Sequence, residues 1–361
     1  MATGNNRNRN TNSQRNRQAH PSGHGKRKKK RVPNYGRILG CAIPLVLVIC
    51  VIIFFVRLII WDKGVEYIMT PEDYNNIKLD TKDNVILMPP GKVMEEGTYD
   101  GKTSVLIFGN DSYYEGCKEG NGIIDLLQAE VPDVEIYNCC LPGSQLCCYP
   151  DEDGDPDNSV PENFFTLFWL AYSVNWGDFS KQREALGSLD AGKYDISRYK
   201  DVLDTLENLD IESIEVVMFC YDGHDYVAGN LPIQYVGEDA KTEDVCSVLG
   251  SVYTSIYTFN EFHPSIQYVF VCPAFCYAKD EKGKNVSCAI QDTGYGTIEE
   301  TFNAARLITN YYGMSYVDMY SGVLINEDNA NHYLEKDGIT PNKKAREMIA
   351  DRLVTLLKER L

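Results

Sequence analysis

Short apolar runs alternate with longer amphipathic stretches from residue 103 to the C-terminus. The short runs are rich in β-branched and aromatic residues and end abruptly at polar turns, which is typical of buried strands. Strands separated by helices of this length pair in parallel, and right-handed crossovers then place helices on both faces of the sheet. The strands are expected at residues 105–108, 134–137, 214–220, 266–271 and 314–317.

The stretches between these strands predict helices. The final helix has the clearest pattern, with Thr340 expected as its N-cap, Pro341 at its first helical position, and Ile349 and Leu353 on its apolar face. Together these elements predict an α/β fold of three layers (α/β/α), doubly wound, with a flavodoxin-like parallel sheet of five strands. The other helices are expected at residues 122–130, 162–176, 196–209, 242–262 and 298–312.

The N-terminal part of the chain differs from the rest in charge. Residues 1–61 hold 12 of the 35 Lys and Arg residues and none of the 52 Asp and Glu residues, which leaves 23 basic against 52 acidic residues after Trp61. Residues 1–37 are polar with few apolar side chains, so we expect a disordered basic tail. The uncharged run at residues 38–56 would span about 28 Å as a helix, close to the hydrocarbon thickness of a bilayer. We therefore expect one transmembrane helix at residues 38–60.

The charge pattern also predicts an orientation. Lys and Arg concentrate before the helix and acidic residues follow it, which places the tail in the cytoplasm and the acidic part outside. A cleavable signal peptide is the rival interpretation, but the apolar run is longer than usual for one, and no small-x-small cleavage site precedes Trp61. The sequence thus predicts a single-pass protein of the cell membrane, with residues 61–102 as a stalk that packs along an extracytoplasmic domain at residues 103–361. We expect a membrane and not nucleic acid as a partner, and the oligomeric state stays open.

Ten of the twelve cysteines lie beyond the predicted transmembrane helix. Those in or at the ends of predicted strands are expected to be small buried apolar residues: Cys139, Cys140, Cys220 and Cys272. Because an exported domain forms disulfides, a bridge among the loop cysteines stays open: Cys117, Cys147, Cys148, Cys276 and Cys288. No Cys-x-x-Cys pair is accompanied by His, and the acidic loop at residues 149–161 lacks EF-hand spacing. We expect no metal and no cofactor.

Four polar loops stand out because they lie where ligands bind in α/β sheets, mostly beyond the carboxyl ends of strands. They read Gly109-Asn110-Asp111-Ser112, Asn138 to Gly143, Asp222-Gly223-His224-Asp225 and Asp337-Gly338-Ile339-Thr340. In this order and spacing they resemble the SGNH or GDSL hydrolase family over about residues 103–361. That family has a three-layer α/β fold, and its members hydrolyse or transfer acyl esters, often on carbohydrates.

The resemblance implies a role for each loop and reveals departures from the family pattern. Gly143 matches the glycine of the oxyanion hole, and Asp337 matches the aspartate of the catalytic triad. The other three catalytic positions are altered. Aligned from the first glycine, the nucleophile position holds Asp111, the oxyanion-hole asparagine is His224, and the base is Thr340. A threonine cannot accept a proton near neutral pH, so the family's mechanism does not transfer directly.

Three interpretations of the altered site stay open. Sliding the first loop by one residue makes Ser112 the nucleophile, and His332 is then the nearest candidate for the missing base. If Asp111, His224 and Asp337 converge at the mouth of the sheet, they form an acid–base set or metal ligands. The third interpretation is an inactive descendant with a polar pocket.

Two functions follow from these interpretations. The resemblance implies a membrane-anchored extracytoplasmic esterase or acyltransferase acting on cell-envelope or extracellular carbohydrate, with an acylated carbohydrate or envelope polymer as its substrate. The alternative is a catalytically inactive pseudo-hydrolase that binds an envelope glycan or a partner protein.

Overall fold

The structure, a computed structural model, divides into two compact units at residues 1–77 and 78–361. In the first unit it describes one helix, residues 46–55, whose apolar side chains are exposed. No helix in the described part of the chain is long and apolar enough to cross a membrane. The tail at residues 1–37 and the rest of the predicted transmembrane segment lie outside the described residues, so both stay predictions. The structure describes residues 46–55, 82–93, 99–227, 244–280, 282–292, 296–321 and 324–358.

The second unit contains a five-stranded sheet in which every neighbouring pair is parallel. The strand order is β2-β1-β3-β4-β7, which is the order of flavodoxin-like doubly wound sheets. The predicted α/β class and the number of strands are therefore confirmed. The strands are β1 (Thr103–Gly109), β2 (Val134–Cys140), β3 (Val216–Cys220), β4 (Gln267–Val271) and β7 (Ser315–Val317).

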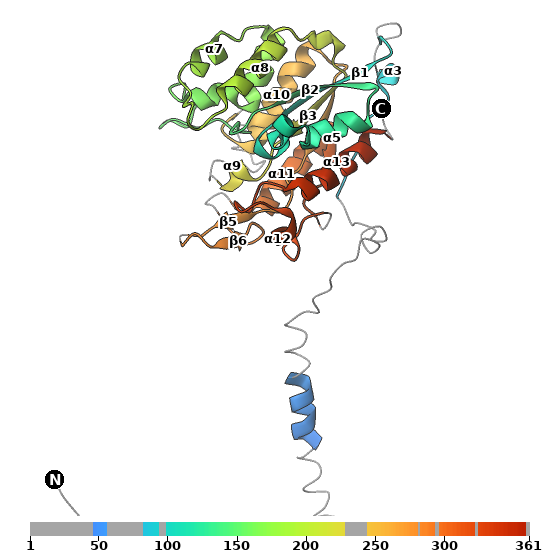
Figure 1. Cartoon of the computed structure of the whole chain (residues 1–361), viewed down its shortest axis with the longest axis vertical. Helices are drawn as coiled ribbons and strands as arrows, with labels where there is room; N and C mark the ends of the chain where they lie inside the picture. Colours follow the sequence, from blue (N-terminus) through green and yellow to red (C-terminus); the bar gives the residue numbers. More distant parts are fainter. Residues whose placement is uncertain are drawn as a thin grey trace, which may run out of the picture. The chain divides into compact units, whose positions relative to one another are not determined.

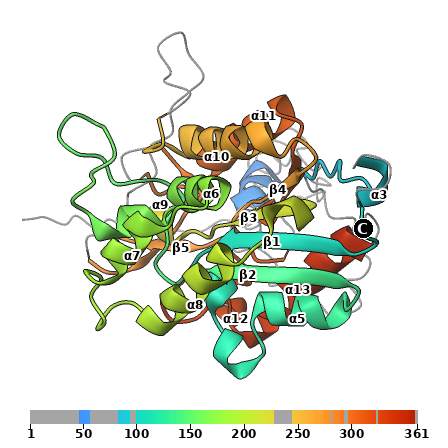
Figure 2. The same cartoon turned by 90° about the horizontal axis from the view of Figure 1, so that it is seen from above.

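Helices cover both faces of the sheet and make three layers (Figure 1, Figure 2). Alternate residues of β1 point to opposite faces. Val105 and Ile107 contribute to the core under one helical layer, whereas Leu106 and Phe108 contribute to the core under the other. One layer holds α5 (Ile123–Glu130) and α13 (Lys343–Lys358), and the other holds α6 (Leu167–Trp176), α7 (Ser180–Leu186), α8 (Ile196–Glu207), α10 (Val248–Phe262) and α11 (Ile298–Tyr311).

The remaining elements are short and lie in the connections. Most of them were not predicted, because three to five residues show no periodicity; the 3-10 turn η2 (Pro161–Phe165) is the exception, since it lies in the range predicted as one helix at residues 162–176. They are α3 (Pro90–Val93), α4 (Asp111–Tyr114), α9 (His224–Val227), α12 (Ala330–Tyr333), the 3-10 turns η1 (Cys117–Glu119), η2 (Pro161–Phe165) and η3 (Ile211–Ser213), and the antiparallel hairpin of β5 (Tyr277–Lys279) and β6 (Asn285–Ser287).

The final helix begins later than the sequence predicted. The side chain of Asn342 caps it, because Oδ1 accepts a hydrogen bond from the N–H of Ala345 at 3.1 Å. Thr340, expected as the N-cap, instead donates its hydroxyl to Asp337 at 2.5 Å. Pro341, expected in the first turn, forms an isolated antiparallel bridge with Leu334. The prediction failed because Thr-Pro and Pro-Asn both offer plausible helix starts, and tertiary pairing selected the second.

Part of the predicted stalk packs on the edge of the sheet. Asn84 exchanges two backbone hydrogen bonds with Tyr316 of β7, each 2.9 Å long. Leu87 is buried in the core beneath α13, and Asp83 forms an ion pair with Arg352 at 2.6 Å. Residues 82–93 therefore belong to the same compact unit as the sheet. Residues 61–81 lie outside the described residues.

We predict that Gly109→Ala destabilises the protein by about 3 kcal/mol, because it inserts a methyl group into a closely packed strand. A Cβ there would overlap the carbonyl oxygen of Cys220 and lie 2.9 Å from Sγ of Cys140. Urea unfolding followed by tryptophan fluorescence measures the change. Gly187→Ala is the matched control: Gly187 is exposed with helical backbone angles, so its effect should stay below about 1 kcal/mol. Equal effects at the two positions would contradict the packing of β1 between its neighbours.

Candidate functional site

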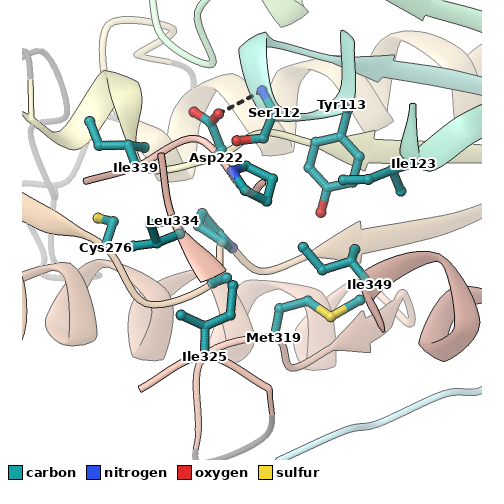
Figure 3. A pocket seen from close by; sticks show the side chains of 14 residues that line it. Ser112, Tyr113, Ile123, Asp222, Cys276, Met319, Ile325, Leu334, Ile339 and Ile349 are labelled. Atoms are coloured by element: carbon teal, nitrogen blue, oxygen red, sulfur yellow. Dashed lines mark hydrogen bonds between the residues drawn. The ribbon is translucent and has the colours of Figure 1, made fainter. Parts of the chain in front are cut away.

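The site lies where the loops after β1 and β3 meet. In this strand order, β1 and β3 flank the point at which the sheet reverses direction, which is where doubly wound folds bind ligands. The two loops are joined by hydrogen bonds. Oδ1 of Asn110 accepts from the N–H of Asp222 at 2.9 Å, and the N–H of Ser112 donates to Oδ2 of Asp222 at 2.8 Å (Figure 3). The absence of a side chain on Gly109 allows this close approach.

Asp222 is the central acceptor of the site. Its side chain is only 7% exposed, and it accepts three hydrogen bonds from two residues. Besides the N–H of Ser112, it receives the backbone N–H of His224 at Oδ1, 2.9 Å away, and ring Nδ1 of His224 at Oδ2, 2.8 Å away. The carboxylate therefore fixes both the backbone and the ring of His224.

His224 lies between two carboxylates. Nδ1 contacts Asp222, and Nε2 lies 3.7 Å from Oδ2 of Asp337. Burial lowers the pKa of His224, but the charge and hydrogen bond of Asp222, the ion-pair contact with Asp337 and the charge of Asp111 together raise this pKa from 6.5 to about 11. The ring is therefore an imidazolium at neutral pH, with both nitrogens protonated.

Asp337 and Thr340 belong to one tight turn before α13. Oδ1 of Asp337 accepts the N–H groups of Ile339 at 2.9 Å and of Thr340 at 3.0 Å, while Oδ2 accepts the Thr340 hydroxyl. Burial raises the pKa of Asp337, but the contact with His224 and the hydrogen bonds of the turn outweigh burial and hold the pKa well below its usual range. Thr340 thus acts as a hydrogen-bond donor at the position where the resemblance expects a base.

Asp111 contacts the glycine that the family resemblance assigns to the oxyanion hole. Its Oδ2 accepts the N–H of Gly143 at 2.8 Å. Gly143 has φ of 78°, and a Cβ there would lie 2.6 Å from the ring of Tyr194, so only glycine fits. Burial and the charge of Asp222 raise the pKa of Asp111, while His224 and the Gly143 N–H partly offset this rise. A carboxylate of the chain itself therefore occupies this donor.

The structure brings Asp111, His224 and Asp337 together, as the second interpretation of the site expected. It also places Gly143 and Thr340 against two of them. The protonated ring of His224 has no free nitrogen lone pair that could bind a metal ion. In the described part of the chain, no group of three or more His, Cys, Asp and Glu side chains is arranged to hold one.

Ser112 is placed less favourably for the first interpretation. It is 4% exposed and lines a cavity of about 20 Å³ whose other walls are mostly apolar (Figure 3). A cavity of this size holds about one water molecule. His332, its proposed base, is exposed on α12, and the described residues show no hydrogen bond between the two.

Sequence reasoning missed the central role of Asp222. The residue was recognised within its loop, but no role was given to it because the family pattern directs attention to the third and fourth positions of that loop. The sequence feature that could have indicated this role is Asp222 followed by Gly223, a pair typical of a turn. An Asp in such a turn tends to accept the N–H two residues later, which orients its carboxylate toward His224.

A polar groove of about 230 Å³ adjoins the site beside Asp337. The β5–β6 hairpin forms one wall through Tyr277 and Asn285, and α12 with the turn that follows it forms the other. The remaining lining residues are Ala330, Asn331, Leu334, Glu335, Lys336 and Gly338. Because Lys336 and Gly338 flank Asp337 in the chain, the groove and the carboxylate share one loop.

Several solved structures are similar to this chain. A possible lipase from Chitinophaga pinensis is 14% identical over 72% of this chain and 98% of its own, with a TM-score of 0.42. A GDSL-like lipase from Bacteroides uniformis is 13% identical over 73% and 100%, at 0.39, and an SGNH hydrolase from Slackia heliotrinireducens is 13% identical over 71% and 99%, at 0.37. No protein-family model and no curated protein matches the sequence. Their names are those of the family that the four loops resemble.

We predict that His224→Gln lowers the free energy of unfolding by about 2–4 kcal/mol near pH 6, because it leaves two carboxylates without their cation. The folded pKa of His224 is raised from 6.5 to about 11, so its contribution is complete below pH 6.5 and is lost as the pH rises toward 11. The difference between wild type and variant should therefore shrink over that interval. Urea unfolding at several pH values measures it.

His332→Gln is the control, because this histidine is exposed and its replacement should change stability by less than about 0.5 kcal/mol. A difference for His224→Gln that is constant from pH 6 to pH 10 would contradict the assignment of the imidazolium.

Proposed function

We propose that this protein binds a carbohydrate through a hydrolase-like domain and does not hydrolyse esters. The observation that carries the proposal is the state of His224, which Asp222 and Asp337 hold as an imidazolium. Two further features support it. The Gly143 N–H is occupied by Asp111, and the position of the family's base is a threonine whose hydroxyl donates to Asp337.

Ester hydrolysis by a serine nucleophile requires a neutral imidazole to accept the hydroxyl proton. Because neighbouring carboxylates raise the pKa of His224 to about 11, the neutral ring is only a minor form at pH 7. The hydrolysis also requires free N–H donors aimed at the developing oxyanion. The Gly143 N–H already donates to Asp111 at 2.8 Å, so a substrate would have to displace a carboxylate of the chain.

The groove beside Asp337 favours a ligand with many hydroxyl groups. Asn285 and Asn331 both donate and accept hydrogen bonds, Glu335 accepts and Lys336 donates, while Tyr277 adds a ring to the wall. Its volume of about 230 Å³ is below that of pockets that enclose a drug-sized ligand, which suits one unit of a polymer whose other units stay outside. The excess of acidic residues after Trp61 disfavours a strongly anionic polymer. An uncharged glycan fits best.

The N-terminal sequence supports an envelope glycan as the ligand. The uncharged run at residues 38–56 and the basic residues before it are the pattern of a single-pass anchor that leaves the acidic domain outside the cell. A tethered domain meets the envelope polymer at a high local concentration, so that weak binding by a shallow groove is sufficient.

A second candidate function rests on Asp111. Burial raises the pKa of this carboxyl group, and a carboxyl group titrating closer to neutral pH at the nucleophile position is suited to general acid–base catalysis on an ester. In this alternative the protein is an esterase or acyltransferase that activates water or an acceptor hydroxyl through Asp111 instead of through Ser112.

Reaction of the full-length chain in detergent with a fluorophosphonate probe tests the absence of a serine nucleophile. We expect no covalent labelling, because Ser112 lacks a neutral base. Labelling that disappears in Ser112→Ala would overturn the proposal and restore the serine mechanism. Hydrolysis of acetylated sugars that persists in Ser112→Ala but is lost in Asp111→Asn would instead favour the second candidate.

Sedimentation of the same protein with insoluble chitin, cellulose and peptidoglycan tests the binding. We expect retention on at least one polymer, reduced about tenfold when Asn331 and Lys336 are both replaced by Ala, since two groove hydrogen bonds are lost. Asp153→Ala in an exposed loop is the matched control and should bind normally. Failure to bind any of the three polymers, or equal binding by the groove variant, would contradict the groove as the binding site.

A further inference from the structure

Two buried cysteines face each other at the base of the β5–β6 hairpin. Cys276 directly precedes β5 and Cys288 directly follows β6. Their side chains are at most 1% exposed. The hairpin pairs Tyr277 with Ser287, so the antiparallel register brings the two cysteines opposite each other one step further along.

Hydrogen bonds confirm this placement. The N–H of Cys288 donates to the carbonyl oxygen of Cys276 at 3.2 Å, and the N–H of Cys276 donates to Sγ of Cys288 at 3.4 Å. Residues opposite each other in an antiparallel pair have Cα atoms about 4.5–5.5 Å apart, and disulfides span about 4.4–6.8 Å. A bond between the two sulfurs therefore needs only side-chain rotation.

The thiols also interact electrostatically. A hydrogen bond to Cys288 and burial raise the pKa of Cys276 well above its usual value, and the same hydrogen bond lowers the pKa of Cys288. Cys288 is thus the better nucleophile of the pair. The backbone geometry agrees, because the N–H of Cys276 donates to Sγ of Cys288.

We propose that Cys276 and Cys288 form a disulfide that locks the hairpin against the candidate site. The reaction is thiol–disulfide exchange with a small disulfide such as oxidised glutathione. The Cys288 thiolate attacks one sulfur of that disulfide and releases one thiolate. The Cys276 thiolate then attacks the mixed disulfide, forming the Cys276–Cys288 bond and releasing the second thiolate, and the two thiolates take up the two protons lost by the cysteines.

The position of the hairpin gives this bond a consequence for the site. A Cβ on Gly223, between Asp222 and His224, would lie 2.6 Å from Sγ of Cys276. The N–H of Tyr277 donates to the carbonyl oxygen of Gly338 at 2.8 Å, next to Asp337. The hairpin thus contacts both loops that hold the imidazolium. Closing its base limits its opening and fixes the wall of the groove that Tyr277 and Asn285 form.

A second pair of buried cysteines, in contrast, lies too far apart to form a disulfide. Cys140 of β2 and Cys220 of β3 are both fully buried near Gly109. Strand β1 lies between β2 and β3, so these two residues are separated by about two strand spacings, or 9–10 Å, which exceeds the reach of a disulfide. The pair at the base of the hairpin has no intervening strand.

Formation of the bond in the cell rests on the proposed extracytoplasmic location, whereas its formation in vitro does not. The test equilibrates the purified full-length chain in detergent with reduced or oxidised glutathione and maps disulfides by mass spectrometry of proteolytic peptides. We expect a Cys276–Cys288 peptide in the oxidised sample. Oxidation should also raise the melting temperature by about 4–8 °C, as expected for closing a short loop.

Cys276→Ser and Cys288→Ser should each abolish the oxidation-dependent shift, while Cys272→Ser, a fully buried control, should retain it. Should the serine variants fail to fold, the oxidised and reduced wild-type protein still give the comparison. Free thiols at both positions in the oxidised sample, or a melting temperature independent of oxidation, would overturn the proposal. A mapped bridge in a protein that binds no glycan would sustain this inference while removing the proposed function.

Discussion

The hydrogen bond between Nδ1 of His224 and Oδ2 of Asp222 is the interaction on which the site depends. It joins a ring to a carboxylate that accepts the N–H of Ser112 in the loop after β1, while the backbone N–H of Asp222 donates to Asn110 in the same loop. The same carboxylate therefore connects two strands of the sheet and sets the charge of the ring. Once His224 is an imidazolium, Asp337 becomes its second counter-ion, and the ring has no free nitrogen to accept a proton at neutral pH.

The imidazolium of His224 lies near several acidic groups at this edge of the sheet. The pKa values of these groups differ because the groups differ in their contact with that cation. Burial raises the pKa of Asp222, but its contact with His224 outweighs burial and keeps the group ionised. Asp225 is also buried, and the described residues give it one hydrogen bond, from the N–H of Leu146 at 2.7 Å, so burial raises its pKa well above the usual value. The pKa of Asp111 is raised less strongly, because His224 and the N–H of Gly143 partly offset the effect of burial. A buried ion pair stabilises the fold little by itself but is costly to break. Replacement of any single member of this group should therefore destabilise the protein.

The sequence predicted the sheet better than the site. Strands such as Val105–Phe108 are buried on both faces, so each appears as a continuous apolar run bounded by polar turns. The late start of α13 and the β5–β6 hairpin were missed because pairing with distant segments decides them, as in the bridge between Leu334 and Pro341. The four loops located the site, and the convergence of its charged residues followed from strand order. The sequence could not predict which carboxylate contacts the ring of His224, because that contact depends on side-chain rotamers.

A titration of His224 observed by NMR, in the full-length chain labelled at its five histidines, tests the central claim most directly. The account predicts that both ring nitrogens of His224 stay protonated through neutral pH, with a pKa near 11, and that Asp222→Asn lowers this pKa by several units, since the largest attractive partner is removed. A His224 pKa between 6 and 7 in the folded protein, unchanged by Asp222→Asn, would contradict the account and return a neutral imidazole to the site.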